Sequence, residues 1–368
     1  MAAADGTSLA GEISRPPRAA GDAVLRAMVG VGTAILVVAA LVLARPVFAP
    51  LAFAMLIIAI VWPLQARLQS FLPKLLALAV SMMTTIVVLA VFGWTLSWGF
   101  TRVARYVITD AGKFQALYNG IADWLEGHGI VISSLWAEHV SPGWIIGIVQ
   151  QVGSRVNGLL SFSVVVLIYV ILGLMEVDLL ARRLRAMDSD GSKRLIAGIT
   201  RTAAKFRRYM LVRSLMSVVT GLLVWAFISL CGLPLAREWG VIAFAFNYIP
   251  FLGPLVATVL PTLFAVAQFD AWQNAILVFA CLNLIQFLVG SYLEPMIAGS
   301  FLAMSPFLVL FSVFFWSFLW GIAGAFIGVP IVIAILTLCA EYPAGRWVAG
   351  LFGTPADGPA DHRGTACG

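Results

Sequence analysis

The segment from Pro295 to Ala340, PMIAGSFLAMSPFLVLFSVFFWSFLWGIAGAFIGVPIVIAILTLCA, has no charged side chain in 46 residues. As one continuous helix it would be about 69 Å long, more than twice the hydrocarbon core of a bilayer at about 30 Å. The segment must therefore break or turn back. It could form one pass, two passes or a re-entrant segment that leaves the membrane on the side where it entered. Non-helical backbone at membrane depth is tolerated only where it is buried in protein or lines a cavity.

Charge is scarce well beyond this segment. From Ser214 to Ala340 the chain has four charged side chains in 127 residues, and the whole chain is 61% hydrophobic and 11% charged. A soluble domain has roughly 25% charged residues. The sequence predicts an all-α, multi-pass membrane protein with about eight transmembrane helices, some of them broken. The predicted spans are Met28–Ala44, Pro46–Trp62, Leu75–Phe100, Leu159–Leu179, Ser214–Leu233, Trp239–Gln268, Trp272–Leu293 and a long one within Pro306–Ala340.

The predicted membrane domain covers residues 24–345, between flexible tails at 1–23 and 346–368. Ten of the 23 Lys and Arg residues fall between Arg182 and Arg213. Basic residues beside a span remain in the cytoplasm, so segment 181–213 is predicted to be a basic cytoplasmic loop, a helix pair broken at Asp188 to Gly191. Eight passes then place both termini in the cytoplasm and segment 101–157 outside.

The outer segment 101–157 carries apolar residues at helical spacing, which predicts an amphipathic helical cap. A solvated loop on the membrane surface is the alternative. The spaced residues are Phe114, Leu117, Ile121, Trp124 and Leu125.

Known enzyme motifs are missing from the sequence. It has no GxxxxGK[ST], HExxH or GxSxG pattern, and its four cysteines are too widely spaced for a zinc site. We therefore predict no catalytic residue, no metal and no cofactor. Because no phosphate-binding loop is present, solute movement would draw on a solute or ion gradient, as in a secondary transporter or a channel. The basic residues cluster beside a span, which indicates membrane topology and not nucleic-acid binding.

The sixth predicted span contains the sequence Asn247-Tyr248-Ile249-Pro250-Phe251-Leu252-Gly253-Pro254. Pro250 and Pro254 each remove an amide donor, so with Gly253 between them they should open the helix. Asn247 and Tyr248 then lie beside freed carbonyl groups and become candidate contacts for a substrate or ion. A purely structural kink is the alternative.

The seventh predicted span carries Asn283, Gln286, Gly290 and Glu294 at spacings that place them on one helical face. A polar stripe in lipid must face protein or water. Asn283 and Gln286 are candidate pathway residues, or they hold helices together through amide hydrogen bonds. Glu294, just before Pro295, is a candidate protonatable coupling group, with an exposed carboxylate as the alternative.

The end of the long run has Gly324 and Gly328 four residues apart, followed by Pro330. This pattern allows close helix approach and adds a kink. Interruptions in both the sixth and eighth spans are typical of transporter sites.

The order of these motifs resembles the autoinducer-2 exporter (AI-2E) family, which includes PerM-like permeases. The resemblance covers residues 24 to 345. It rests on Gly232-Leu233-Pro234, Trp239, Asn247 to Pro254, Leu293-Glu294-Pro295, Gly299, Pro306, Trp316 and the glycine-rich turn that ends at Pro330. The resemblance implies a bacterial inner-membrane exporter of small polar signals or other solutes, while some relatives are similar to sodium/proton antiporters. Many relatives have basic residues after the Glu-Pro pair, whereas this chain has the uncharged Met296–Ser300.

We therefore predict a membrane transporter of a small polar solute, with an autoinducer-2-like molecule as one candidate, driven by a solute or ion gradient. The alternatives are a sodium/proton antiporter and a membrane scaffold that transports nothing. The predicted partners are the lipid bilayer, the solute and protons or sodium; a homo-oligomer is left open. The predicted pathway residues are Asn247, Tyr248, Asn283, Gln286 and Glu294. The predicted backbone-shaping residues are Pro250, Gly253, Pro254, Pro295, Gly299, Gly324, Gly328 and Pro330.

Overall fold

The structure, a computed structural model, describes residues 18–110, 142–269, 271–298 and 304–352, together with isolated positions between 112 and 127. The chain forms two units, residues 1–45 and 46–368. The first unit contains α1, Arg18–Leu43. The second contains α2 (Arg45–Leu68, from residue 46), α3 (Lys74–Thr109), α5 (Pro142–Ala186), α6 (Asp190–Leu230), α7 (Ala236–Phe246), α8 (Leu252–Gln268), α9 (Trp272–Phe287), a π-helical segment (Leu288–Leu293), α10 (Glu294–Ala298), α11 (Pro306–Trp320), α12 (Ile322–Glu341) and α13 (Arg346–Phe352).

The prediction of an all-helical, multi-pass membrane protein is confirmed. Within the described ranges, seven helices are long and apolar enough to cross a membrane, and two shorter apolar helices accompany them. The seven stretches are Leu25–Leu43, Arg45–Leu68, Lys74–Thr109, Ser161–Ala186, Asp190–Leu230, Trp272–Ala298 and Ile322–Glu341.

Several helices extend into segments predicted to be tails or loops. Helix α1 begins at Arg18, so residues 18–23 of the predicted N-terminal tail are helical, and α13 lies in the predicted C-terminal tail. Both ends of segment 101–157 continue as α3 and α5. The five apolar residues of the predicted amphipathic cap, Phe114, Leu117, Ile121, Trp124 and Leu125, lie outside the described residues.

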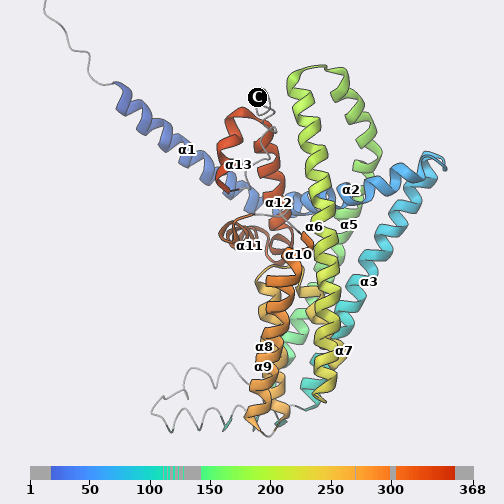
Figure 1. Ribbon diagram of the computed structural model, residues 1–368, viewed down its shortest axis with the longest axis vertical. Helices are drawn as coiled ribbons and strands as arrows, with labels where there is room; N and C mark the ends of the chain where they lie inside the picture. The colour runs from blue at the N-terminus through green and yellow to red at the C-terminus, as the bar shows by residue number, and fades with distance from the viewer. Residues whose placement is uncertain are drawn as a thin grey trace, which may run out of the picture. The chain divides into compact units, whose positions relative to one another are not determined.

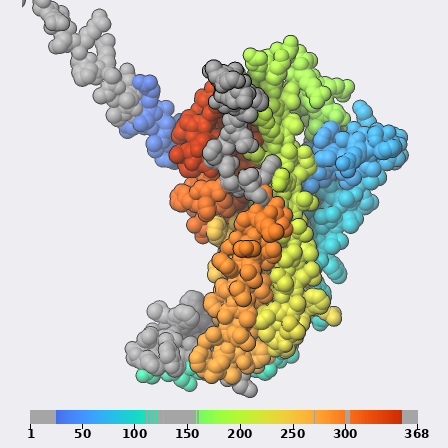
Figure 2. All heavy atoms as spheres, in the orientation of Figure 1, coloured from blue at the N-terminus to red at the C-terminus, as the bar shows by residue number. Residues whose placement is uncertain are grey.

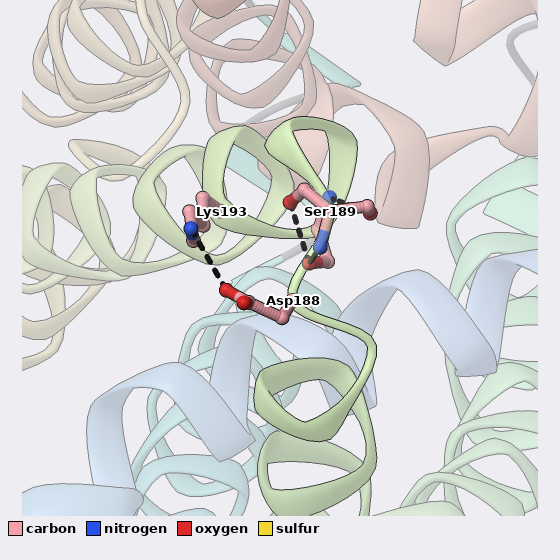
Figure 3. Close-up of polar contacts among 4 residues, drawn as sticks. Asp188, Ser189 and Lys193 are labelled. Carbon is pink, nitrogen blue, oxygen red and sulfur yellow. Dashed lines mark hydrogen bonds and ion pairs between the residues drawn. The ribbon is translucent and has the colours of Figure 1, made fainter.

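The predicted basic loop at 181–213 consists of the end of α5 and the start of α6, the helix pair that the sequence predicted. The break between the two helices falls at Met187–Ser189, overlapping the predicted Asp188–Gly191, and α6 begins at Asp190 (Figure 3). Ser189 caps α6, because its hydroxyl accepts a bond from the Ser192 amide at 3.1 Å while the Ser192 hydroxyl accepts one from the Ser189 amide at 3.2 Å. Asp188, at a left-handed φ of 37°, pairs with Lys193 at 2.8 Å.

The sixth predicted span is not a single broken helix. Helices α7 and α8 run antiparallel, because the Trp239 and Phe264 rings lie 5.4 Å apart and Ala243 shares a core cluster with Ala257. On one helix Trp239 and Phe264 would be about 37 Å apart. Helix α7 has 11 residues, about 16 Å, or half of a membrane core. The pair α7–α8, which we call hairpin 1, therefore reverses the direction of the chain and does not form one continuous span.

Proline and an unusual backbone conformation produce this reversal. Pro250 lies in the break, where it cannot donate a helical hydrogen bond, and Phe251 adopts a left-handed φ of 62°. Gly253 allows the two arms to touch, since a Cβ there would lie 2.2 Å from the Phe246 carbonyl oxygen. The sequence predicted the break at these residues but not the change of direction.

The uncharged run that ends at Ala340 doubles back once in its described part. Helices α11 and α12 meet at Gly321, whose φ is 66°. A Cβ on Gly324 would lie 1.8 Å from the Trp316 carbonyl oxygen, and one on Gly328 would lie 2.8 Å from that of Ser312. This pair, hairpin 2, is therefore packed backbone against backbone. Pro330 is buried inside α12 and does not end it.

Helix α6 is the element on which both hairpins pack (Figure 1). Near one end, Gly221 and Gly240 bring α6 and α7 into backbone contact, since a Cβ on Gly240 would lie 2.8 Å from the Gly221 carbonyl oxygen. At the other end Arg201 of α6 pairs with Glu341 of α12. The two hairpins thus approach α6 from opposite ends. Helices α9 and α10 also run along α6, as Figure 2 shows in orange against yellow-green.

The close approach at Gly324 predicts a strong effect of a single methyl group. We expect Gly324→Ala to lower the melting temperature of the purified protein markedly, because inserting atoms into a packed contact costs about 1–3 kcal/mol or more. Thermal unfolding in detergent, followed by tryptophan fluorescence, measures this effect. Gly93→Ala is the matched control, since a Cβ at Gly93 meets no atom within 4 Å. Equal melting temperatures for the two variants would contradict the described packing of hairpin 2.

Candidate functional site

A buried polar face runs along α6. Thr202, Tyr209, Arg213, Ser217 and Thr220 are spaced 7, 4, 4 and 3 residues apart, which places them on one side of a helix. Four of the five are buried, and the Arg213 side chain is only 11% exposed. Sequence reasoning missed this face, because it begins in the predicted basic loop and ends in the predicted fifth span. The regular spacing of polar residues across that boundary was the available signal.

The break in hairpin 1 contacts this part of α6 through two side chains predicted as pathway residues. Asn247 ends α7, is 6% exposed and donates its amide nitrogen to the Ser217 hydroxyl at 3.3 Å. The Tyr248 hydroxyl donates to the Ser214 hydroxyl at 2.9 Å. The prolines of the break therefore place an amide and a phenol against serines of α6.

Aromatic rings join the tip of hairpin 1 to hairpin 2. The Tyr248 ring stacks on Phe326 of α12, with centroids 5.5 Å apart and planes at 25°. Phe326 stacks in turn on Phe53 of α2 at 5.7 Å, and Phe92 of α3 lies edge-on to Tyr248 at 5.8 Å. The two hairpins therefore meet near the level of Ser214 on α6. We call this region the tip junction; it comprises Asn247, Tyr248, Phe326 and the facing α6 residues 209–220.

A half-buried ion pair lies beside the tip junction. An Arg213 guanidinium nitrogen is 3.2 Å from a Glu294 carboxylate oxygen, and the two side chains are 11% and 20% exposed. The guanidinium also lies over the Tyr209 ring, 5.8 Å from its centroid. The two charges cancel, so the ion pair leaves the tip junction without net charge.

The four polar residues of the seventh predicted span do not share one environment. Gln286 is 8% exposed and Glu294 faces Arg213, whereas Asn283 and Gly290 are exposed. The amide nitrogen of Asn283 bonds to the Phe279 carbonyl of its own helix at 2.8 Å. The predicted single stripe is therefore wrong.

The π-helical segment at Leu288–Leu293 explains the position of Glu294, which follows it, but not the separation of Asn283 from Gln286, since both precede it in α9. A π-turn contains about one more residue than an α-turn, which rotates the residues that follow it. Glu294 thereby lines up with Gln286 on the side that faces α6. Periodicity calculated for an α-helix cannot anticipate this rotation.

Several buried polar atoms around the tip junction have no hydrogen-bond partner among the described residues. They are the Arg213 Nε, the Thr220 hydroxyl and the Gln286 amide nitrogen, whereas the Tyr209 hydroxyl interacts with the Arg213 side chain. The Arg213–Glu294 pair fixes how α6 is aligned with the helix that contains α9 and α10. Thr220 follows Arg213 by seven residues, and Gln286 precedes Glu294 by eight. The two side chains therefore lie near the same level. Leaving a buried polar group unpaired costs about 1–3 kcal/mol. Such a group of unpaired donors is suited to binding polar solutes or water.

The remaining predicted residues shape the backbone or fall outside the described ranges. Pro295 lies inside the continuous helix Trp272–Ala298, directly after the π-helical segment, where it removes one amide donor. Pro254 lies in the first turn of α8, where its missing amide breaks no hydrogen bond. Gly299 lies outside the described residues.

Two hairpins that meet at a neutral polar junction are the kind of interrupted helices that membrane transporters use to build solute sites. The fold and the site therefore define a multi-pass membrane transporter.

Comparison with known proteins gives the family. The model of the AI-2E family of transporters matches residues 32–344, and the chain belongs to this family. The AI-2 transport protein TqsA of Escherichia coli (strain K12) is 27% identical over 334 residues, which cover 89% of this chain and 95% of TqsA. A "Putative transport protein" of Borreliella burgdorferi is 32% identical over 195 residues, covering 52% of this chain and 54% of that protein.

The ion pair gives a test of the site's electrostatics. We expect Arg213→Gln to lower the melting temperature, because it leaves the half-buried Glu294 carboxylate unpaired at a cost of about 1–3 kcal/mol. The double variant Arg213→Gln/Glu294→Gln should recover most of that loss, since two neutral amides can bond to each other. Lys193→Gln breaks an exposed pair and should change stability by less than about 1 kcal/mol. A double variant less stable than the single one would refute the pairing.

Proposed function

We propose that this protein moves a small, uncharged, hydroxylated solute across the bacterial inner membrane through the tip junction. The observation that carries the proposal is the set of unpaired, buried polar groups beside a neutralised ion pair. An unpaired amide nitrogen, a guanidinium N–H and the Thr220 hydroxyl can donate hydrogen bonds to the oxygens of a polyol or a hydroxylated ring. An ionic solute is disfavoured, because the charge of Arg213 is already balanced by Glu294.

The relatives support a solute of this class. TqsA is described as a transport protein for AI-2, and this chain covers 95% of its length. We therefore take autoinducer-2 or a molecule of similar size and polarity as the substrate to test. The five residues after Pro295, Met296–Ser300, carry no charge, unlike those of many relatives, which agrees with an uncharged solute.

The hairpins suggest how the solute would be exchanged between the two sides. Hairpin 1 covers the outer part of α6 and hairpin 2 the inner part, and the stacked rings of Tyr248 and Phe326 lie between their ends. Moving one hairpin away from α6 would open the tip junction to one side only. This is alternating access around a fixed site, driven by a solute or ion gradient.

The proposed topology keeps both termini in the cytoplasm. Replacing the sixth and eighth predicted spans with hairpins that return to the same side leaves six crossings, which is still an even number. The cluster of basic residues at the α5–α6 turn then lies inside, in agreement with the positive-inside rule.

The substrate proposal is tested by flux into proteoliposomes. We expect labelled autoinducer-2 to enter liposomes that contain the purified protein, and Gln286→Leu to reduce the rate about tenfold, the factor that corresponds to about 1.4 kcal/mol of lost hydrogen bonding. Asn283→Leu is the matched control, because Asn283 lies one turn away on the same helix but is exposed. An equal loss of flux in both variants, or none in either, would contradict the proposed role of Gln286.

Glu294 is proposed as the protonatable coupling group. We expect Glu294→Gln to remove the dependence of solute flux on an imposed proton gradient, because the amide cannot take up or release a proton. The wild type and the variant are compared in proteoliposomes at equal protein content, with melting temperatures measured in parallel. Unchanged proton dependence in a folded variant would exclude Glu294 from coupling.

A further inference from the structure

A polar pocket lies where α3, the C-terminal end of α6 and the start of α7 meet. Its volume is about 530 Å³, within the range of about 300–1,000 Å³ that is usual for small-ligand sites. We call it the corner pocket. Its lining includes Arg102 of α3, Trp225 of α6, and Leu235, Arg237 and Glu238 at the start of α7. Asn247 lies at the other end of α7, so the corner pocket is separate from the tip junction.

Arg102 is held at the pocket with most of its hydrogen-bond donors free. Its Nε lies 3.3 Å from a Glu238 carboxylate oxygen, and its guanidinium carbon lies 5.8 Å from the centroid of the Trp98 ring. The Glu238 side chain is 7% exposed, whereas that of Arg102 is 59% exposed. None of the residues that the structure describes bonds to the two terminal guanidinium nitrogens. A planar guanidinium with free N–H groups can bind two oxygens of one phosphate group.

The corner pocket carries a net positive charge. Arg237 is exposed and forms no ion pair with any described residue. The charges of Arg102, Arg237 and Glu238 therefore sum to one positive charge. The backbone adds to it, because Leu235 gives no side-chain cap and the first three amides of α7 have no acceptor within the described ranges. The pocket is thus suited to a ligand with one negative charge.

Tryptophan rings place the corner pocket at the boundary between membrane and water. Trp98 contacts the Arg102 guanidinium, and Trp225 lines the pocket while 43% exposed. Tryptophan is enriched at the level of the lipid headgroups. An apolar stripe continues from Trp225 along the same face of α6, where Leu222 is 54% exposed and Val218 is 46% exposed. A charged site for a headgroup is therefore continuous with an apolar surface inside the membrane.

We propose that the corner pocket binds the phosphodiester of an anionic glycerophospholipid such as phosphatidylglycerol. Arg102 and Arg237 contact the phosphate oxygens, and an acyl chain lies along the stripe formed by Trp225, Leu222 and Val218. One phosphodiester neutralises the single net charge of the pocket.

The same features disfavour two related ligands. A zwitterionic lipid brings an ammonium group, and the one carboxylate that lines the pocket, that of Glu238, is already bonded to Arg102. Inorganic phosphate offers the same oxygens but has no chain to cover the apolar stripe. The corner pocket does not depend on which solute the protein transports.

Photo-crosslinking locates the bound lipid without measuring transport. Purified full-length protein in a non-ionic detergent is mixed with a subsaturating amount of phosphatidylglycerol that carries a diazirine on one acyl chain. After illumination, tandem mass spectrometry of its peptides identifies the labelled residues. We expect labelling on α6 between Val218 and Ser229, and Arg237→Gln should reduce its yield about fivefold, the effect of one exposed charge contact. Arg237 is the residue to replace, because it is exposed and its loss leaves no described partner unpaired.

A second arginine controls for general attraction between the lipid and positive charge. Arg105 lies three residues after Arg102 on α3, is exposed, and does not line the pocket. Arg105→Gln removes the same charge as Arg237→Gln and should leave the labelling of α6 unchanged. Unlabelled phosphatidylglycerol should compete with the probe about fivefold better than phosphatidylcholine, which has no net charge. Inorganic phosphate should not compete.

The opposite results would overturn the proposal. Labelling that is unchanged in Arg237→Gln, or reduced equally in Arg105→Gln, would show that the pocket does not hold the lipid. Equal competition by phosphatidylcholine would refute the charge selectivity, and displacement by inorganic phosphate would assign the pocket to the free ion. Because solute flux is not part of this measurement, each of these outcomes leaves the proposed transport function to its own test.

Discussion

Lipid hydrocarbon offers no hydrogen bonds, and this constraint organises the second unit of the chain. A helix that ends at mid-depth exposes unpaired backbone groups, so protein must cover it. Helix α7, with 11 residues, is too short to cross the core, and the break that follows it is covered by α6. The serines of α6 accept hydrogen bonds from Asn247 and Tyr248, while Phe326 of hairpin 2 stacks on the Tyr248 ring. The polar site thus exists because α7 stops where its end must be covered by protein.

The sequence predicted the break at Pro250 but not how the chain would turn there. In the second hairpin it predicted a kink at Pro330, whereas Pro330 lies inside α12 and the chain turns at Gly321. Hydropathy, however, is averaged along the chain and does not report a reversal of chain direction. Two short apolar helices that form a hairpin therefore have the same hydropathy profile as one long span. The reversal in hairpin 1 also depends on a left-handed φ at Phe251, a residue type that rarely adopts it.

The site was only partly within reach of the sequence. Asn247, Gln286 and Glu294 could be chosen because polar residues are conspicuous in apolar runs. Tyr209 and Arg213 were not chosen from the sequence. They lie in or beside the cluster of basic residues, which membrane topology already explained. The alignment of Glu294 with Gln286 followed from a π-helical turn, which arises from packing and leaves no periodic trace in the sequence.

The contact between Gly221 and Gly240 has a mechanical consequence. Two backbones touch there with no side chain between them, and a single added methyl on either residue would clash. Side chains can exchange rotamers and allow neighbouring helices to slide, but bare backbones at contact distance have no such freedom. Helices α6 and α7 therefore behave as one stiff piece. The arm of hairpin 1 that carries Asn247 acts as a fixed wall, and rearrangements around it must be made by the elements that pack through side chains.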